Sequence, residues 1–405
     1  MKTNDSKIFP YFFGIILILE IYVYQAVKNV TKNKKIRLTY WVITILLYGI
    51  IITLMLTFEK GSRDQTKVHW LAALFTMFLV PKVLIAAVLL LGDIFRVAEY
   101  SLQRFTKPQK TFPERRKFLS LTALGFGAAL SYTFLDGMVW GKYRYFVRNV
   151  KIKIPNLPKS FKGYKVLQIS DVHSGSFSDP SKLQHAIDMI NEQNADLILF
   201  TGDMVNAYAE EFVPFVKLFS TIRSKDGKLA VLGNHDYGGY GTWKSKEEHA
   251  QNVPKLIELE KQAGFDMLRN EFRIIEKNGE KLYIVGVENW GVPPFPQYGD
   301  LDKATHGIPA DAAKILMSHD PTHFDQIVKK HPSNIHLTLS GHTHGMQFGL
   351  DLKNIKWSPV QYKYPKWADL YESMGKYLYV NRGFGVIGYP GRVGVKPEIT
   401  VFELS

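Results

Sequence analysis

Four long apolar stretches in the first third of the chain constrain its fold more than any other feature. A helix needs roughly 20 residues to cross the hydrocarbon core of a bilayer, and each stretch is close to that length. The stretches lie at about 8–27, 41–58, 70–92 and 118–135. We therefore expect four transmembrane helices within residues 1–138. The aromatic and basic segment that follows, 139–164, is typical of an interfacial linker.

Positive charge is concentrated around these stretches. The 405 residues carry a formal net charge of +14, but residues 1–150 hold 21 Lys and Arg against 8 Asp and Glu, whereas residues 151–405 hold 30 against 29. A nucleic-acid-binding domain carries its own basic field, and the second part of the chain has none. The excess is instead typical of membrane topology, so we expect a lipid bilayer and no nucleic acid as partner.

Two of the loops between the apolar stretches are rich in basic residues. These residues are Lys28, Lys32, Lys34, Lys35 and Arg37 after the first stretch, and Arg96, Arg104, Lys107, Lys110, Arg115, Arg116 and Lys117 before the fourth. The middle loop has fewer, and Glu59 and Asp64 offset them. Because basic loops stay in the cytoplasm, we expect a multi-pass protein of the cell membrane whose chain after residue 135 lies on the extracytoplasmic face.

Charged residues at the edge of the apolar stretches or within them allow more than one interpretation. Arg115 and Arg116 resemble a twin-arginine export signal or form a basic anchor beside a helix, and both interpretations place the following domain outside the cytoplasm. Glu20 and Lys82 fall inside apolar stretches, where charges are functional candidates by default. For these two we favour a structural ion pair, or a lysine that reaches the interface where Pro81 breaks the helix, and we assign no site.

The remainder of the chain, residues 165–405, alternates short β-branched runs with helical patterns. Strands are expected at 166–170, 196–201, 229–232, 282–287, 314–317, 336–339, 377–380 and 399–402. Helices are expected at 183–193, 211–222 and 247–264. This alternation indicates a layered α/β domain with its strands buried in the middle.

Residues that can bind metals follow five of these strands. They are Asp171 and His173; Asp203; Asn234, His235 and Asp236; His319; and His342 with His344. Ligands bind beyond the carboxyl ends of the strands in open α/β sheets, so these loops can converge on one site. The chain has no cysteine, which leaves imidazole, carboxylate and amide groups to hold a metal.

Each of these motifs alone is weak evidence, because a single Gly-Asp or Asp-x-His is more often turn chemistry than a metal site. The segment Gly341-His342-Thr343-His344-Gly345 is more specific. It places two imidazoles around one residue between two glycines, which suits a crowded metal loop. The motifs together, in this order and at these strand ends, predict a metal centre.

The same motifs resemble, one by one, those of the calcineurin-like metallophosphoesterase family, over roughly residues 150–405. Segments 154–158, 381–385 and 397–400 with Arg392 resemble its bacterial membrane-associated branch, which includes YkuE- and YaeI-like proteins. The resemblance implies a four-layer α/β/β/α sandwich behind the four transmembrane helices. It also implies hydrolysis of a phosphate mono- or diester with two divalent metal ions, for which the ligand types favour Mn, Zn or Fe.

Roles for the motif residues follow from this resemblance. One metal would be bound by Asp171, His173, Asp203 and His344, and the other by Asp203, Asn234, His319 and His342. Asp203 would bridge the metals, and a hydroxide between them would be the nucleophile. His235 would bind no metal and would donate to the phosphoryl or leaving oxygen, with Asp236 orienting its ring. Met346 stands where the family usually has Gly, and we expect it to narrow the loop floor.

The substrate is the least determined feature. Aromatic and Pro-rich segments at 290–298 and 356–371 form either an apolar lip or ordinary loop packing. With the membrane tether they favour a lipid- or envelope-linked ester. One alternative is a nucleotide or nucleic-acid phosphodiesterase, which the near-neutral second part disfavours. Another is a non-catalytic, metal-dependent membrane sensor, which would be expected to lack His235 or a metal ligand.

Overall fold

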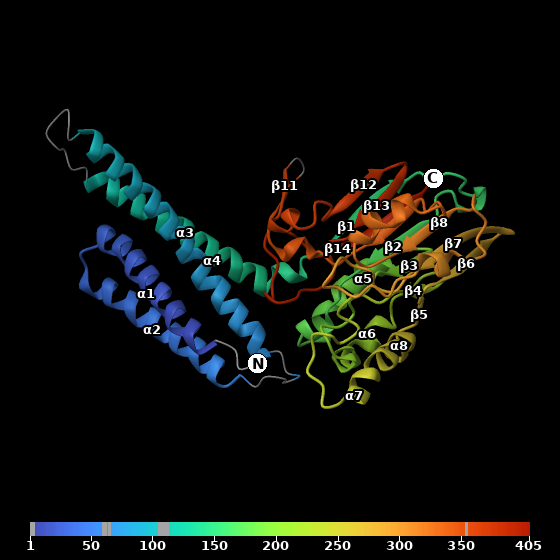
Figure 1. Cartoon of the computed structure of the whole chain (residues 1–405), viewed down its shortest axis with the longest axis horizontal. Helices are drawn as coiled ribbons and strands as arrows, with labels where there is room; N and C mark the ends of the chain where they lie inside the picture. Colours follow the sequence, from blue (N-terminus) through green and yellow to red (C-terminus); the bar gives the residue numbers. More distant parts are fainter. Residues whose placement is uncertain (1–4, 59–62, 64–65, 104–112, 353–354) are drawn as a thin grey trace. The chain divides into compact units, whose positions relative to one another are not determined.

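The computed structural model describes residues 5–58, 63, 66–103, 113–352 and 355–405. The chain forms two compact units (Figure 1). The helical unit comprises Met1–Glu59 and Thr66–Asp136, and the α/β unit comprises Lys60–Gln65 and Gly137–Ser405. The basic residues Arg104, Lys107 and Lys110, which entered the topology argument, lie outside the described residues.

The described part of the helical unit consists of four helices, the last of which continues into the α/β unit. They are α1 (Asp5–Val30), α2 (Lys34–Leu56), α3 (Thr66–Gln103) and α4 (Pro113–Val139). Asn33 caps α2, because its side chain accepts the backbone N–H of Lys35 at 2.9 Å. Among the described residues, three helices are long and apolar enough to cross a membrane, over Lys34–Leu56, Thr66–Ser101 and Glu114–Val139.

A buried polar cluster joins three of these helices. The Glu20 carboxylate on α1 is 2% exposed, and its Oε1 lies 2.6 Å from Lys82 Nζ on α3. Tyr48 donates to Oε1 at 2.6 Å and Tyr40 donates to Oε2 at 2.7 Å, both from α2. The expected structural ion pair is therefore present. Both carboxylate oxygens accept donors, as a buried charge requires.

Two six-stranded sheets form the centre of the α/β unit. The first has the order β1-β14-β2-β3-β4-β5 and the second the order β12-β13-β9-β8-β7-β6. The first contains β1 (Phe146–Ile152), β2 (Lys165–Ile169), β3 (Leu197–Phe200), β4 (Lys228–Ala230), β5 (Phe265–Met267) and β14 (Glu398–Leu404). The second contains β6 (Glu271–Lys277), β7 (Glu280–Gly286), β8 (Lys314–Met317), β9 (Leu337–Ser340), β12 (Asp369–Ser373) and β13 (Lys376–Val380). Strands β10 (Leu350–Leu352) and β11 (Ile355–Trp357) pair separately.

Alternating side chains divide this unit into layers. On β3, Leu199 lies in the core between the sheets, whereas the next residue, Phe200, packs with the helices outside the first sheet. On β8, Ile315 lies in the same central core and Leu316 packs in the outer cluster of the second sheet. The helices outside the sheets are α5 (Gln184–Glu192), α6 (Val216–Phe219), α7 (Lys246–Ala250), α8 (Asn252–Gln262), α9 (Leu301–Thr305) and α10 (Thr322–Gln326). The expected α/β/β/α sandwich is confirmed (Figure 1).

Several element boundaries differ from the sequence-based expectations. The segment 139–164, expected as an interfacial linker, contains β1, which pairs in parallel with β14 along its whole length. Aromatic and basic residues occur both at membrane interfaces and in edge strands, so the composition of this segment did not distinguish a linker from a strand. The helix expected at 211–222 is a 3₁₀ segment, Ala209–Phe215, followed by the short α6. Pro214 explains this break, because proline cannot donate the helical hydrogen bond.

Candidate metal centre

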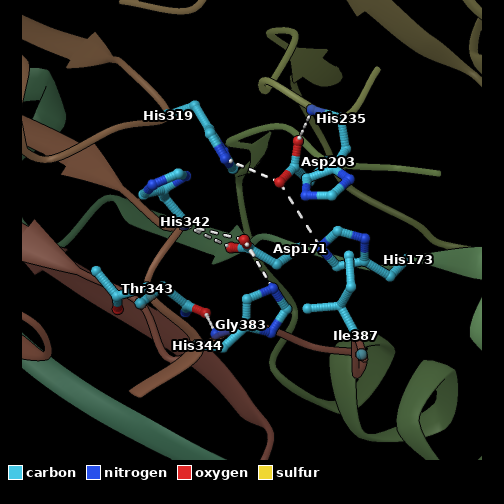
Figure 2. A network of polar contacts seen from close by, with 12 residues as sticks. Asp171, His173, Asp203, His235, His319, His342, Thr343, His344, Gly383 and Ile387 are labelled. Atoms are coloured by element: carbon cyan, nitrogen blue, oxygen red, sulfur yellow. Dashed lines mark hydrogen bonds and ion pairs between the residues drawn. The ribbon is translucent and has the colours of Figure 1, made fainter. Parts of the chain in front are cut away.

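The loops that follow five strands of the two sheets converge at one place (Figure 2). Parallel neighbours β2, β3 and β4 deliver three of the loops, and parallel neighbours β8 and β9 deliver the other two. Their carboxyl ends therefore meet as expected for an α/β fold. The loops carry Asp171 and His173; Asp203; Asn234, His235 and Asp236; His319; and His342 with His344.

One group of potential ligands consists of Asp171, His173 and His344, all of them buried, with ligand atoms within 4.8 Å of one another. The Nε2 atom of His344 lies 3.2 Å from Asp171 Oδ1. His173 Nδ1 lies 3.0 Å from the side-chain oxygen of Asn206. Because an amide oxygen only accepts, Nδ1 carries the proton and Nε2 offers its lone pair toward the group.

A second group consists of Asp203, His319 and His342, again within 4.8 Å of one another. The Asp203 Oδ2 atom lies 3.0 Å from His319 Nε2 and 3.6 Å from His173 Nε2, which belongs to the first group. Asp203 thus stands between the two groups. Asn234 joins the second, since its Oδ1 lies 2.8 Å from His342 Nδ1.

The ligand atoms themselves are chemically suited to cations. The Nε2 atoms of His173, His319 and His344 are buried and face carboxylate oxygens of Asp203 or Asp171, but among the described residues none has a partner with hydrogen-bond geometry. The Nδ1 atom of His319 donates to the Thr201 carbonyl at 2.7 Å, so Nε2 is the ring atom that faces Asp203 and is available to a cation. Buried polar atoms normally find a partner. Imidazole nitrogens of this kind, converging with the carboxylates of Asp171 and Asp203, fit divalent metal ions.

The backbone at these positions is strained. Asp171, His173, Asp203, His342 and His344 all have positive φ, between 47° and 70°. Left-handed backbone costs a non-glycine residue on the order of 1–3 kcal/mol and persists where the surroundings enforce it. The neighbouring glycines are needed for close approach: a Cβ at Gly341 would collide with the Asp171 carboxylate, and one at Gly233 with that of Asp203.

His235 lies beside the two groups and belongs to neither of them. Its Nδ1 donates to the Asn206 carbonyl at 2.7 Å, so Nε2 is left for another partner. Its backbone N–H donates to Asp203 Oδ1 at 2.8 Å. Burial lowers the pKa of His235, and the nearby Asp203 carboxylate opposes that shift.

Asp236 was expected to orient the His235 ring, but its carboxylate contacts backbone N–H groups instead. Its buried carboxylate accepts the backbone N–H groups of Gly233, Asp203 and Met204, each at 2.8 Å. It therefore ties the loops after β3 and β4 together, while the Asn206 carbonyl orients the His235 ring. Met346 also differs from its expected position, because it is 58% exposed and does not fill the loop floor.

Sequence reasoning gave no contact with the ligands to several residues that surround them, although Tyr364 belongs to a segment expected to form an apolar lip. Asn206 holds both His173 and His235. The Tyr364 hydroxyl lies 2.8 Å and the Asp320 carboxylate 3.4 Å from His342 Nε2. Nothing in the motif spacing signals Asn206 or Tyr364, whereas Asp320 directly follows the motif residue His319 and could have been found.

Two further residues to which the sequence analysis gave no role in the site contact His344 and His235. The buried Arg392 donates to the Gly383 and Gly385 carbonyls and lies 3.4 Å from His344 Nδ1. Tyr240 stacks on the His235 ring with 4.2 Å between the ring centroids, and its hydroxyl accepts the Asn234 side-chain amide at 2.9 Å.

An α/β/β/α sandwich that carries two groups of imidazole and carboxylate ligands at its strand ends is the architecture of a metallophosphoesterase. The family model described as calcineurin-like phosphoesterase matches residues 164–346, and the model described as probable calcineurin-like phosphoesterase, transmembrane domain, matches residues 6–142. The chain belongs to the calcineurin-like metallophosphoesterase family, with an N-terminal membrane segment, and the resemblance found from sequence is confirmed.

Relatives agree with this assignment. The metallophosphoesterase YkuE of Bacillus subtilis is 31% identical over 301 residues, which cover 72% of this chain and 97% of the relative. The transmembrane protein with metallophosphoesterase domain of Danio rerio is 26% identical over 373 residues, or 88% of this chain and 80% of the relative. Phosphodiesterase YaeI of Escherichia coli is 26% identical over 296 residues, or 72% of this chain and 98% of the relative. The protein is thus a membrane-associated metallophosphoesterase of a family that uses divalent metals.

Proposed function

We propose that this protein hydrolyses a lipid- or envelope-linked phosphate mono- or diester at a centre for two divalent cations. The observation that carries the proposal is the position of Asp203, whose Oδ2 lies within 3.6 Å of an imidazole from each ligand group. A carboxylate between two cation sites reduces the repulsion between the ions. The ligand chemistry suits Mn, Zn or Fe.

The assignment of ligands to the two cations follows the two groups. Asp171, His173, Asp203 and His344 would hold one, and Asp203, Asn234, His319 and His342 the other. Bound divalent cations lower the pKa of a coordinated water and stabilise negative charge on phosphoryl oxygens. The protein's own contribution is to fix each imidazole from behind, as the Thr201 carbonyl does for His319.

His235 is the proposed hydrogen-bond and proton donor to the leaving oxygen. With Nδ1 bound to the Asn206 carbonyl, the Nε2 atom is the one available to a substrate. A positioned acid of this kind contributes about 10²–10⁴ in rate. Asp236 supports this loop through the backbone and, in this proposal, does not take part in proton transfer.

Aromatic side chains beside the second ligand group support an ester with an apolar part. The Phe295 ring meets the His342 ring edge-on at 4.7 Å, and Tyr364 lies 5.3 Å from it. These two residues come from the two segments in which an apolar lip was expected. The E. coli relative is named a phosphodiesterase, which supports including diesters among the candidates.

The proposed location of the reaction is the extracytoplasmic face. The basic residues in and around the turn between α1 and α2 support it, since basic segments of this kind stay in the cytoplasm. A reporter fused after Ser405 should be active outside the cytoplasm and silent inside it. The reverse pattern would assign the reaction to the cytoplasmic face.

The activity is tested by supplying the purified full chain with Mn and a panel of phosphomonoesters, phosphodiesters and phospholipids. We expect turnover that a chelator abolishes, with lipid-linked esters preferred over nucleotides. Preference for a nucleotide would favour the alternative phosphodiesterase. Absence of turnover with every ester, in protein that binds metal, would favour the sensor.

A further inference from the structure

The two-stranded hairpin that follows the His344 loop exposes an unusual amount of apolar surface. Strands β10 and β11 pair antiparallel directly after the 3₁₀ turn His344–Gln347, and β11 is labelled in Figure 1. The exposed apolar residues of the hairpin, with their exposed fractions, are Leu350 (50%), Leu352 (60%), Ile355 (56%) and Trp357 (36%). Contiguous exposed apolar surface marks a site of interaction.

Strand register places these side chains on one face. Leu350 pairs with Trp357 and Leu352 with Ile355, whereas the intervening pair is Asp351 with Lys356. Directly opposed residues share a face, and successive residues alternate between faces. The hairpin therefore has one face of four apolar side chains and one face that carries an acidic and a basic residue.

The polar face is the one that contacts the rest of the α/β unit. Asp351 Oδ2 lies 3.0 Å from Nε of Arg382, a side chain that is fully buried. Lys356 Nζ lies 3.0 Å from Asp369 Oδ2 and donates to the Ala368 carbonyl at 2.7 Å. Strong polar contacts thus fix the orientation of the hairpin and hold its apolar face outward.

This arrangement is the reverse of a hairpin in contact with water. A sheet with one solvated face turns polar side chains to the solvent and apolar ones to the protein. Here the ion pairs point inward and leucine, isoleucine and tryptophan point outward. Such a surface is stable in an apolar or interfacial medium, where tryptophan in particular is enriched.

The position of the hairpin beside the end of α4 indicates which medium its apolar face meets. The last turn of α4 belongs to the α/β unit, and the Gly137 carbonyl there accepts the Arg392 N–H at 3.1 Å. The next residue, Val393, accepts the N–H of Gly349 at 3.0 Å, immediately before β10. Two backbone hydrogen bonds, through the adjacent residues Arg392 and Val393, therefore connect the start of the hairpin to the end of a candidate membrane span, Glu114–Val139.

We propose that the apolar face of the β10–β11 hairpin docks into the interfacial region of the bilayer leaflet at which α4 ends. The inference rests on the membrane segment and on the orientation of the hairpin, not on the proposed reaction. Because the His344 loop leads directly into β10, docking also keeps the ligand loop close to the headgroups, where a lipid-linked ester resides.

The chain has no cysteine, so one introduced thiol can carry a fluorescent probe at a single position. We would place an environment-sensitive NBD probe at Leu352→Cys and, as the matched control, at Ile274→Cys. Ile274 is also an exposed aliphatic residue (42%), but it lies on β6 at the far edge of the second sheet. The full chain is reconstituted in nanodiscs of phosphatidylcholine and phosphatidylglycerol, with or without lipids that carry a nitroxide near the headgroup.

Docking predicts a blue-shifted emission at position 352 and loss of that emission with the nitroxide lipids, with neither change at position 274. Equal behaviour of the two probes would overturn the proposal. A blue-shifted probe that lipid nitroxides do not quench would mean that protein, such as a second copy, covers the hairpin, and would also overturn it. Leu350→Cys provides a second position on the same face if the first variant folds poorly. Phosphatase measurements on the same samples keep this test separate from the proposed reaction.

Discussion

Two buried polar clusters, one in each unit, differ in how completely their polar atoms are hydrogen-bonded. In the helical unit, both oxygens of Glu20 accept donors, from Lys82, Tyr48 and Tyr40. In the metal centre, three imidazole Nε2 atoms are buried without hydrogen-bond partners among the described residues. A cluster whose polar atoms are all hydrogen-bonded is accounted for by stability alone, whereas buried atoms without partners call for a ligand or another explanation. The difference assigns a structural role to the first and a functional role to the second.

The largest expected effect comes from the residue between the ligand groups. Asp203→Asn keeps the shape of the side chain and removes the charge that faces His173 and His319. We expect turnover to fall to background, with the fold retained because Asp236 still accepts the backbone N–H groups of residues 203 and 204 and so links the two loops. Steady-state rates measure the loss of turnover, and thermal unfolding followed by circular dichroism measures whether the fold is retained. Full activity of Asp203→Asn would contradict the functional role assigned to the cluster in the α/β unit.

His235→Asn should have the next largest effect, a fall in kcat of about 10²–10⁴ with metal content unchanged. The loss should be smaller for a nitrophenyl ester than for an alkyl ester, because nitrophenolate is a weak base and needs less protonation. Comparing the two esters in wild type and variant tests the role of a proton donor. Equal losses accompanied by loss of metal would make His235 a ligand instead.

Breaking the cluster in the helical unit should affect stability and leave chemistry intact. Lys82→Met leaves the Glu20 carboxylate buried without its cation, which should cost the helical unit about 3 kcal/mol. The double variant with Glu20→Leu should recover part of that loss, since it also removes the buried charge. Thermal unfolding in detergent measures the stability, and kcat on a soluble ester should stay at the wild-type value. A large fall in kcat at unchanged stability would show a functional role for this ion pair.

The smallest effect is expected from Tyr240→Phe. This change keeps the ring stacked on His235 and removes only the hydroxyl that accepts the Asn234 amide. One neutral hydrogen bond contributes about 1 kcal/mol, so we expect a loss of about fivefold in kcat/KM. Tyr240→Ala removes the stacking as well and should lose more. Identical rates in the two variants would mean that the ring does not position His235.

Sequence alone predicted the parts of this molecule that depend on local order along the chain. The motif residues follow their strands closely, so their convergence could be inferred from the fold class. Asn206, Tyr364 and Arg392 could not be inferred in this way, because each contacts a ligand or His235 only after the loops have folded. Strand β1 was missed because its pairing partner, β14, lies about 250 residues away in the chain.

The central claim is that the α/β unit holds two cations that share Asp203, and metal stoichiometry tests it most directly. The full chain is stripped with chelator, loaded with Mn, freed of excess and analysed by mass spectrometry for metal per chain. We expect two ions in wild type, two in His235→Asn and a loss at both sites in Asp203→Asn. A single ion in the wild type, or two ions retained in Asp203→Asn, would contradict the account.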